Sequence, residues 1–319
     1  MTGIKVGVVR GGPSSEYEVS LKTGGNVLKF LPERYKGVDI LITKSGEWHL
    51  RGIVARPSRI FQNVDVIFNA MHGEFGEDGK VQQIFEEHGI PYTGSKTFSS
   101  ALAMNKVMAR NAFLNAGIKI PRVFVIKECE SSPEQTAKKI FQAFSPPWVL
   151  KPASKGSSVG VKIIENFGDL ASGIKEVFRY GKTAMVEEYI KGREATCGVL
   201  ENFRGERHYA LPPVEIIPRV KFFDYGAKYD GSTKEICPAN FDLAAKREIE
   251  HLAKEAHKIL GCSAYSRSDF IVSPRGIFLL ETNTLPGLTS QSLFPKSCVA
   301  VGLTFSGLLD HIIRLAMRA

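Results

Sequence analysis

The sequence of 319 residues predicts a mixed α/β protein that begins with a parallel sheet. The first observation is that strand-like and helix-like segments alternate over the first hundred residues, which is typical of parallel strands joined by helices. The second is that the pattern changes beyond about residue 120 to short, antiparallel-looking strands. The third is length, because a chain of this size buries a large core and divides into two or three units. We expect units at residues 1–105, 106–190 and 191–319.

The N-terminal unit is expected to form a sheet flanked by helices. Apolar, β-branched runs predict its strands, at residues 4–9, 38–43 and 64–70. Helical periodicity predicts its helices, at residues 17–30 and 78–88. Ligands of such sheets bind beyond the carboxyl ends of the strands. Gly11-Gly12 and His72-Gly73 fall there, so we expect this edge to form part of a binding site.

The remaining elements follow from the same signals. A helix is predicted at 99–115, because Gly117 and Pro121 end its periodic pattern. Strand-like pieces follow, at residues 122–126, 148–151, 160–164 and 183–188. The last third is expected to contain, in order, a mixed loop region at 215–240, a helix at 242–260, a hairpin at 267–293 and a helix that runs to the C-terminus.

Composition narrows the class of protein. The net charge of +9 comes from scattered residues, and no nucleic-acid motif accompanies it, so a basic cleft for a nucleotide explains the charge as well. We therefore expect no nucleic-acid partner. No apolar run approaches the roughly 18 residues of a spanning helix, and the start does not resemble a signal peptide. We expect a cytoplasmic protein without a membrane partner, whose five widely spaced cysteines are reduced thiols.

The stretch 267–293 is the most informative for function, and it reads as two strands joined at Pro274-Arg275-Gly276. A three-residue loop with a left-handed glycine would place Asp269 opposite Glu281. A two-residue loop would shift the register by one and send these acids to opposite faces. Together with Asn283, they would form an all-oxygen site suited to Mg²⁺ that also carries phosphates. The alternative is a solvated hairpin face with ordinary salt bridges.

A loop of glycine and serine predicts a phosphate site. Lys151 ends an apolar strand, and the sequence PASKGSSVG follows it. Backbone N–H groups of such a loop can close on phosphate oxygens while the lysine adds charge. The alternative is a flexible surface hairpin. A Walker-type loop is disfavoured, because Gly181-Lys182-Thr183 lacks the glycine five residues earlier, and the first turn has no GxGxxG.

Three acids and a histidine complete the candidates. Glu187 and Glu194 flank a turn after an apolar strand, and their carboxylates can accept hydrogen bonds from adenine or ribose. Glu16 stands just ahead of a helix, where it could hold an ammonium group, and His72 stands at the end of a strand. The alternative for Glu187 and Glu194 is a charged strand end, and the alternative for Glu16 is a helix cap. The alternative for His72 is a loop histidine whose hydrogen bonds are satisfied.

These segments occur together in the order found in the D-alanine–D-alanine ligases, a family of the ATP-grasp superfamily. The chain resembles this family over nearly its whole length, through the segments GGPSSEYEVS, HGEFGEDG, KPASKGSSVG, VEEYIKGRE, DYGAKY, RSDF and ETNTLPGLTSQSL. The resemblance implies an ATP-grasp fold preceded by a Rossmann-like N-terminal domain. It also implies ATP-dependent joining of two D-alanines through an acyl phosphate, for peptidoglycan. Two Mg²⁺ ions, replaceable by Mn²⁺, would assist, and a homodimer follows only by analogy.

The resemblance implies a role for each matched residue. The residues implied to contact ATP are Lys106, Lys151, Ser157, Ser158, Glu187, Glu188, Tyr189, Ile190, Glu194 and Phe222. Those implied to hold the two metal ions are Asp269, Glu281 and Asn283. Glu16 would accept the first substrate's ammonium, while Ser292 and the backbone of Leu293 would hold the second substrate's carboxylate. Arg267 and the Gly287 amide would stabilise the oxyanion, and His72 would also act in catalysis.

The resemblance further implies a mobile loop over the site, at residues 222–234. Its closure would bring Tyr229 towards Ser157 and Glu16 as a hydrogen-bonded triad, move Lys228 to the reaction centre and keep water from the acyl phosphate. Tyr229 favours a dipeptide product, because relatives that make an ester with D-lactate tend to carry phenylalanine there. The loop departs from the family at Gly226, where glutamate is common. Leu285, where serine is frequent, is a second departure. The alternative is an ordered loop packed by its aromatic residues.

Overall fold

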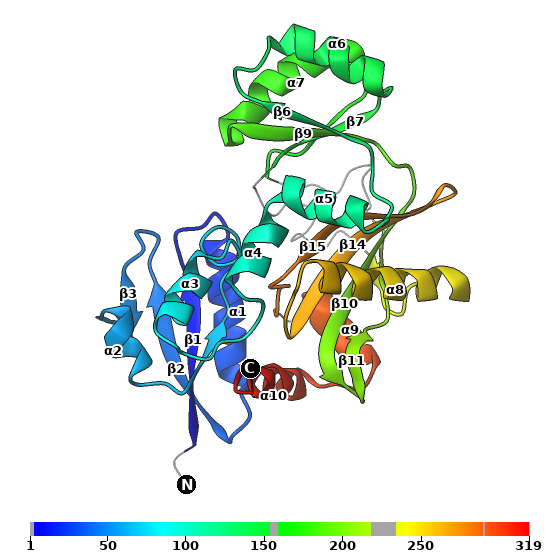
Figure 1. Cartoon of the computed structure of the whole chain (residues 1–319). Coiled ribbons are helices and arrows are strands. Elements are labelled where there is room, and N and C mark those ends of the chain that lie inside the picture. Colours follow the sequence, from blue (N-terminus) through cyan, green and yellow to red (C-terminus); the bar gives the residue numbers. More distant parts are fainter. Residues whose placement is uncertain (1–2, 154–158, 218–233, 290, 319) are drawn as a thin grey trace.

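The protein is described from a computed structural model, which covers residues 3–153, 159–217, 234–289 and 291–318. It contains three β-sheets with helices packed against them, as Figure 1 shows. The mixed α/β class predicted from the sequence is confirmed. The unit boundaries near residues 105 and 190 stay a prediction.

The first sheet has the strand order β4-β3-β2-β1-β5. Its centre is parallel, because β1 (Ile4–Gly11) pairs in parallel with both β2 (Tyr35–Ile42) and β5 (Val66–Asn69), as predicted. Helices α1 (Tyr17–Phe30) and α3 (Lys80–Glu87) lie close to their predicted bounds. The sequence reading missed three short elements, namely β3 (Trp48–Leu50), β4 (Ile53–Val54) and α2 (Pro57–Phe61). Segments of two to five residues are too short to show a period.

The single helix predicted at 99–115 is wrong, because the structure has two helices there. Helix α4 (Thr97–Met104) ends at Asn105, and α5 (Lys106–Asn115) starts directly after it. Asn105 has extended backbone angles, φ −82° and ψ 94°, and its side chain accepts a hydrogen bond from the N–H of Met108. Asparagine in this position is a favoured N-cap, which explains why a second helix starts here.

The second sheet is antiparallel, with the order β6-β9-β7-β8. Its strands are β6 (Val123–Lys127), β7 (Trp148–Pro152), β8 (Lys162–Ile164) and β9 (Thr183–Glu188), close to the predicted pieces. Helices α6 (Pro133–Ala143) and α7 (Leu170–Val177) pack on it, and the short 3₁₀ helices Phe167–Asp169 and Phe178–Tyr180 flank α7. The buried Trp148 packs among Ile140 and Ile174, which come from these two helices.

The third sheet has the order β13-β12-β10-β14-β15, and β11 pairs with the far end of β10. Its strands are β10 (Arg193–Phe203), β11 (Glu206–Ala210), β12 (Val214–Ile217), β13 (Lys234–Ile236), β14 (Tyr265–Ser273) and β15 (Gly276–Asn283). Helix α8 (Leu243–Ile259) packs on one face, where Ile249 and Ala253 meet Val199. The loop predicted at 215–240 is wrong at both ends, because β12 and β13 lie within it and pair with each other.

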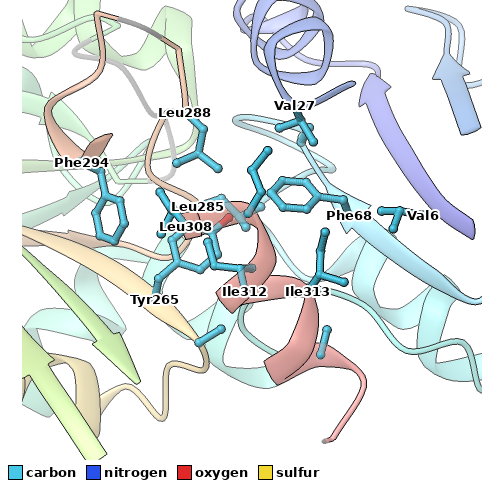
Figure 2. Close-up of a cluster of buried hydrophobic side chains, with 14 of the residues drawn as sticks. Val6, Val27, Phe68, Tyr265, Leu285, Leu288, Phe294, Leu308, Ile312 and Ile313 are labelled. Atoms are coloured by element: carbon cyan, nitrogen blue, oxygen red, sulfur yellow. The ribbon is translucent and has the colours of Figure 1, made fainter. Parts of the chain in front are cut away.

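The C-terminal segment forms two helices rather than the single one predicted. Gly302, with φ +74°, separates α9 (Leu293–Ala300) from α10 (Phe305–Ala316). Figure 2 shows Leu308, Ile312 and Ile313 of α10 in one apolar cluster. Val6 and Phe68 of the first sheet lie on one side of them, and Tyr265 of the third sheet and Phe294 of α9 lie on the other. Helix α10 therefore fixes the N-terminal unit against the sheet that carries the hairpin acids.

A search of the described helices for membrane spans found no single one that is long and apolar enough. Among the described helices, only α9 and α10 taken together have the length and composition of a membrane span, and they are bent by 102° at the break between them.

Candidate active site

The hairpin β14–β15 brings its two acids together, but not in the way the sequence suggested. Ser273 pairs with Gly276, so the loop has two residues, and the predicted three-residue loop is wrong. A β-bulge then shifts the register, because Leu279 faces Phe270 while Glu281 faces Asp269, which leaves Leu280 as the extra residue. The bulge restores the pairing that a two-residue loop alone would lose. The predicted Asp269–Glu281 pairing is thereby confirmed.

A bidentate ion pair fixes the first acid. The Nε and Nη2 atoms of Arg267 donate to the two carboxylate oxygens of Asp269, each at 2.9 Å. Thr196 on β10 donates its hydroxyl to the same carboxylate at 2.7 Å. Burial works against the charge of Arg267, but Asp269 outweighs it and raises the pKa of the guanidinium. Asn283 lies opposite Arg267, and its side-chain oxygen accepts from the N–H of Leu285 at 2.8 Å.

The second acid is joined to helix α5. The Nζ atom of Lys106, the first residue of that helix, forms an ion pair with Glu281 Oε2. Burial opposes the positive charge of Lys106, but Glu281 more than offsets it, so the pKa of the lysine is raised. A lysine predicted for phosphates and an acid predicted for a metal, 175 residues apart, are therefore in direct contact.

The second sheet supplies another buried charge cluster. Glu187 on β9 forms ion pairs with Lys151 on β7 at 2.9 Å and with Arg110 on α5 at 2.8 Å. Burial lowers the pKa of Lys151, and Glu187 compensates this only in part. A nearby phosphate would favour the charged form of Lys151. Lys106 and Arg110 lie four residues apart on α5, so this helix connects the two clusters.

The strand end after Glu187 carries the other residues expected to contact a nucleotide. The carboxylate of Glu188 accepts from Arg122 and Arg275, each at 2.8 Å, so its side chain is engaged across the second and third sheets. Ile190 is buried, whereas Tyr189 is 37 % exposed. Glu194 lies on β10 two residues before Thr196, on the face that holds Asp269.

The N-terminal unit contributes a compact set of polar groups at the carboxyl edge of its sheet. Glu16 and His72 are both buried, at 9 % and 5 % exposure. Gly73 has φ +69°, which favours glycine, and a Cβ there would lie 2.5 Å from Ser14 Oγ and 2.8 Å from Glu16 Oε2. His72 contacts the hydroxyl of Thr23 at 2.8 Å and the carboxylate of Glu77 at 3.3 Å. The negative charge of Glu77 also reaches Arg267, so this edge faces the hairpin.

The segment after β15 ends in a helix N-terminus. Ser292 is the residue before α9, and its hydroxyl accepts from the N–H of Thr289 at 3.0 Å rather than capping the helix. A Cβ on Gly287 would lie 2.8 Å from the same hydroxyl. The unused N–H groups at a helix start favour an anion such as a carboxylate. Ser292 and Leu293 lie at this helix start.

Five residues implied by the family resemblance lie outside the described residues, namely Ser157, Ser158, Phe222, Lys228 and Tyr229. Three residues with clear structural roles were missed by the sequence reading. Arg110 could have been found, because it follows Lys106 by one helical turn. Glu77 could have been found too, because it lies in the matched segment HGEFGEDG five residues after His72. Thr196 has no signal in the sequence, since only strand pairing brings it to Asp269.

The hairpin oxygens fit a magnesium site in their chemistry. Asp269, Glu281 and Asn283 offer carboxylate and amide oxygens, the ligands that hard divalent cations prefer. In the structure the two acids are paired with Arg267 and Lys106 instead. Cationic side chains thus balance the charge at the place that a metal ion would take.

Comparisons with known proteins show the family to which the chain is similar. A family model described as D-ala D-ala ligase C-terminus matches residues 113–314, and one described as D-ala D-ala ligase N-terminus matches residues 5–59 and 53–95. The D-alanine–D-alanine ligase of Syntrophobacter fumaroxidans is 38% identical over 318 residues, covering 98% of each chain. That of Geotalea uraniireducens is 40% identical over 315 residues, covering 98% of this chain and 95% of the relative.

Solved structures agree over the same length. The VanG D-Ala:D-Ser ligase from Enterococcus faecalis is 34% identical, with a TM-score of 0.85, and the match covers 99% of this chain and 100% of that one. The D-alanine–D-alanine ligase from Bacillus anthracis complexed with ATP is 31% identical, with a TM-score of 0.82, and covers 99% and 98%.

Proposed function

The chain belongs to the D-alanine–D-alanine ligase family, and from this membership we propose how its own residues divide the work of the reaction. The fold is the ATP-grasp fold of that family. The protein joins two D-alanine molecules to D-alanyl-D-alanine, with ATP converted to ADP and phosphate, through a D-alanyl phosphate. The dipeptide serves cell-wall synthesis.

The first step transfers a phosphoryl group to the carboxylate of the first D-alanine. We propose that Lys106 and Lys151 hold the phosphates, since each already forms an ion pair with an acid, Lys106 with Glu281 and Lys151 with the buried Glu187. Two Mg²⁺ ions held by Asp269, Glu281 and Asn283 would neutralise the charge that develops on the phosphate oxygens, and Mn²⁺ would substitute. Glu187 and Glu194 are assigned to the adenine and ribose, the backbone of Glu188 and Ile190 to the adenine edge, and Tyr189 to the face of the base.

The second step is attack by the amine of the second D-alanine on the acyl phosphate. Glu16 is assigned to the ammonium of the first substrate, because its buried carboxylate lies at the sheet edge that faces Arg267. His72, held by Thr23 and Glu77, positions this edge. Arg267 and the Gly287 amide are assigned to the oxyanion, which needs donors already in place. Ser292 and the N–H of Leu293 are assigned to the second substrate's carboxylate.

The remaining roles come from the family alone. Ser157 and Ser158 are assigned to the phosphates and Phe222 to the nucleotide. Tyr229 is assigned to a triad with Ser157 and Glu16, and Lys228 to the reaction centre. Together they would exclude water, which would otherwise hydrolyse the acyl phosphate.

One observation carries the assignment of the site. The bulged hairpin sets Asp269 opposite Glu281, and Lys106 reaches Glu281 from a helix of another part of the chain. Bulges are over-represented next to active sites, where they re-aim a side chain. The same acids, lysines and oxyanion donors support ligation rather than nucleotide binding alone.

The experiment that tests the function is a coupled assay of ADP release with product analysis. D-Alanine alone should give D-alanyl-D-alanine and one ADP per dipeptide. Parallel reactions contain D-alanine with D-serine, D-lactate or L-alanine. A dipeptide of D-alanine with D-serine as the main product would contradict the assignment of the second substrate. Release of ADP without any peptide bond would contradict ligation itself.

We also propose a cytoplasmic location, because ATP is available there, and a homodimer by analogy with relatives. Sedimentation at several protein concentrations tests the dimer, and a single species of monomer mass would contradict it.

A further inference from the structure

A second group of potential ligands lies outside the proposed active site. Glu201 on β10, His208 on β11 and His257 on α8 bring their side-chain atoms within 4.8 Å of one another. Glu201 and His208 face each other across the pairing of β10 with β11. His257 reaches them from the helix that covers this face of the sheet. Thr196 and Asp269 point to the other face, so the group is separate from the hairpin acids.

The spacing of these atoms suits a tetrahedral metal ion. Glu201 Oε1 lies 3.5 Å from His257 Nε2 and 3.7 Å from His208 Nε2. Metal–ligand bonds of about 2.0–2.1 Å at tetrahedral angles separate neighbouring ligand atoms by roughly 3.4 Å. Small movements of the side chains would therefore suffice to close the site. These contacts are long for direct hydrogen bonds, although they lie within the range of ion pairs.

The buried histidine supplies an independent observation. His257 has no exposed surface, and its Nε2 atom has no hydrogen-bond partner among the described residues. A buried ring nitrogen without a partner costs free energy, because water no longer satisfies it. This atom points to the oxygen of Glu201 and to His208 at the same time. A metal ion between the three groups would satisfy it.

The surroundings orient the ligand atoms. The other ring nitrogen of His257 lies 2.7 Å from the hydroxyl of Ser266, which fixes the ring. The second carboxylate oxygen of Glu201 accepts from the N–H of Ala264 at 2.8 Å, which leaves Oε1 directed at the histidines. Metal-binding histidines and carboxylates commonly have such second contacts.

We propose that Glu201, His208 and His257 bind one Zn²⁺ ion that fastens helix α8 to the β10–β11 hairpin. The ligand set of two imidazoles and one carboxylate suits Zn²⁺ rather than Mg²⁺. A water molecule would take the fourth position. The competing explanation is an ion pair between Glu201 and a protonated histidine, which needs no metal.

The test uses the full-length protein, stripped of metals and titrated with Co²⁺, whose visible bands report tetrahedral coordination. Excess Mg²⁺ is present throughout so that Co²⁺ does not occupy the hairpin acids. We expect one tightly bound Co²⁺ with intense visible bands, which Zn²⁺ displaces. Zn²⁺ at about one hundred times its dissociation constant should also raise the thermal midpoint by roughly 3–6 °C.

Variants separate this site from its surroundings. His208→Ala and His257→Gln should each weaken Co²⁺ binding at least about tenfold and remove the thermal shift. His251→Ala, which removes an exposed histidine from the same helix, should leave both signals unchanged. Glu281→Gln should also leave them unchanged, because it alters only the hairpin.

Three results would overturn the proposal. The first is native protein that binds no Co²⁺ in the presence of Mg²⁺. The second is a signal that His208→Ala leaves intact. The third is a signal lost in Glu281→Gln, which would place the ion at the hairpin. If His257→Gln does not fold, the native stoichiometry and His208→Ala still decide the question.

Discussion

Replacing Arg110 by methionine should weaken both the fold and the binding of ATP. The guanidinium is 3 % exposed and lies 2.8 Å from the carboxylate of Glu187. At that distance and an effective dielectric constant of about 20, the gross attraction is about 6 kcal/mol, part of which is offset by the cost of burying both charges. Removing one partner of a buried pair typically costs about 3–5 kcal/mol.

The expected loss lies at the lower end of that range. Lys151 remains 2.9 Å from Glu187, so the carboxylate keeps one cation. We therefore expect the free energy of unfolding to fall by about 3 kcal/mol, measured by urea denaturation. Because Glu187 would then interact with Lys151 alone, the lysine should be held away from the phosphates. The KM for ATP should rise while the KM for D-alanine changes little.

Arg122→Met is the matched control for this variant. It also removes a guanidinium 2.8 Å from a buried glutamate, Glu188, but Arg122 is 62 % exposed and Glu188 keeps Arg275. Such a pair contributes less than about 1 kcal/mol. If Arg110→Met lost no more unfolding free energy than the control and its KM for ATP were unchanged, the role given to the buried cluster would be refuted.

Three further changes test other parts of the structure. Glu281→Gln should lower ADP formation at least about a thousandfold while the circular dichroism spectrum stays native, because the change removes a proposed metal ligand but little packing. Near-normal turnover would contradict the metal assignment. Ile312→Ala should lower the free energy of unfolding in urea by about 2–4 kcal/mol. It should also raise the KM for D-alanine, because α10 packs the N-terminal unit against the third sheet. An unchanged KM would contradict this role of α10. Burial raises the pKa of Glu188, but hydrogen bonds from Arg275 and Arg122 outweigh this and lower the pKa below 4.5. The stability that these ion pairs contribute is therefore complete above pH 4.5 and is lost as the pH falls through the lowered pKa. Arg275→Gln should therefore destabilise the protein at pH 7 and make it less sensitive to acid below pH 4.5, and equal urea midpoints for native and variant at pH 7 would contradict this linkage.

Many elements could be predicted because their signals are local, but no element was predicted where α6, α7, β10 and β11 lie. The strand at Thr183–Glu188 and the helix at Tyr17–Phe30 have the predicted bounds, since apolar runs and periodicity mark them. The break at Asn105 was missed because one capping residue interrupts an otherwise continuous helical pattern. The apolar run of α10 was predicted, but not that its residues lie between two units, because contacts between distant segments leave no periodic trace.

The candidate site, like the fold, could be predicted from the sequence only in part. The pairing of Asp269 with Glu281 was predicted through the wrong turn, because neither a two-residue loop nor a bulge at Leu280 can be recognised from residue types alone. The contact of Lys106 with Glu281 spans 175 residues and depends on how α5 packs against the third sheet. The family resemblance predicts which residues belong to the site, whereas the contacts between them depend on how distant segments pack.

The ion pair between Lys106 and Glu281 has a thermodynamic consequence for the order of binding. In this structure the lysine proposed for the phosphates and the acid proposed for the metal neutralise each other. A phosphate that draws Lys106 away leaves Glu281 with an unbalanced negative charge, which a divalent cation satisfies. A cation on Glu281 equally releases Lys106 for the phosphate. Under these assignments each ligand would strengthen binding of the other by the same factor, as reciprocity requires. The enzyme would accept nucleotide and metal as one cooperative unit and discriminate against either one alone.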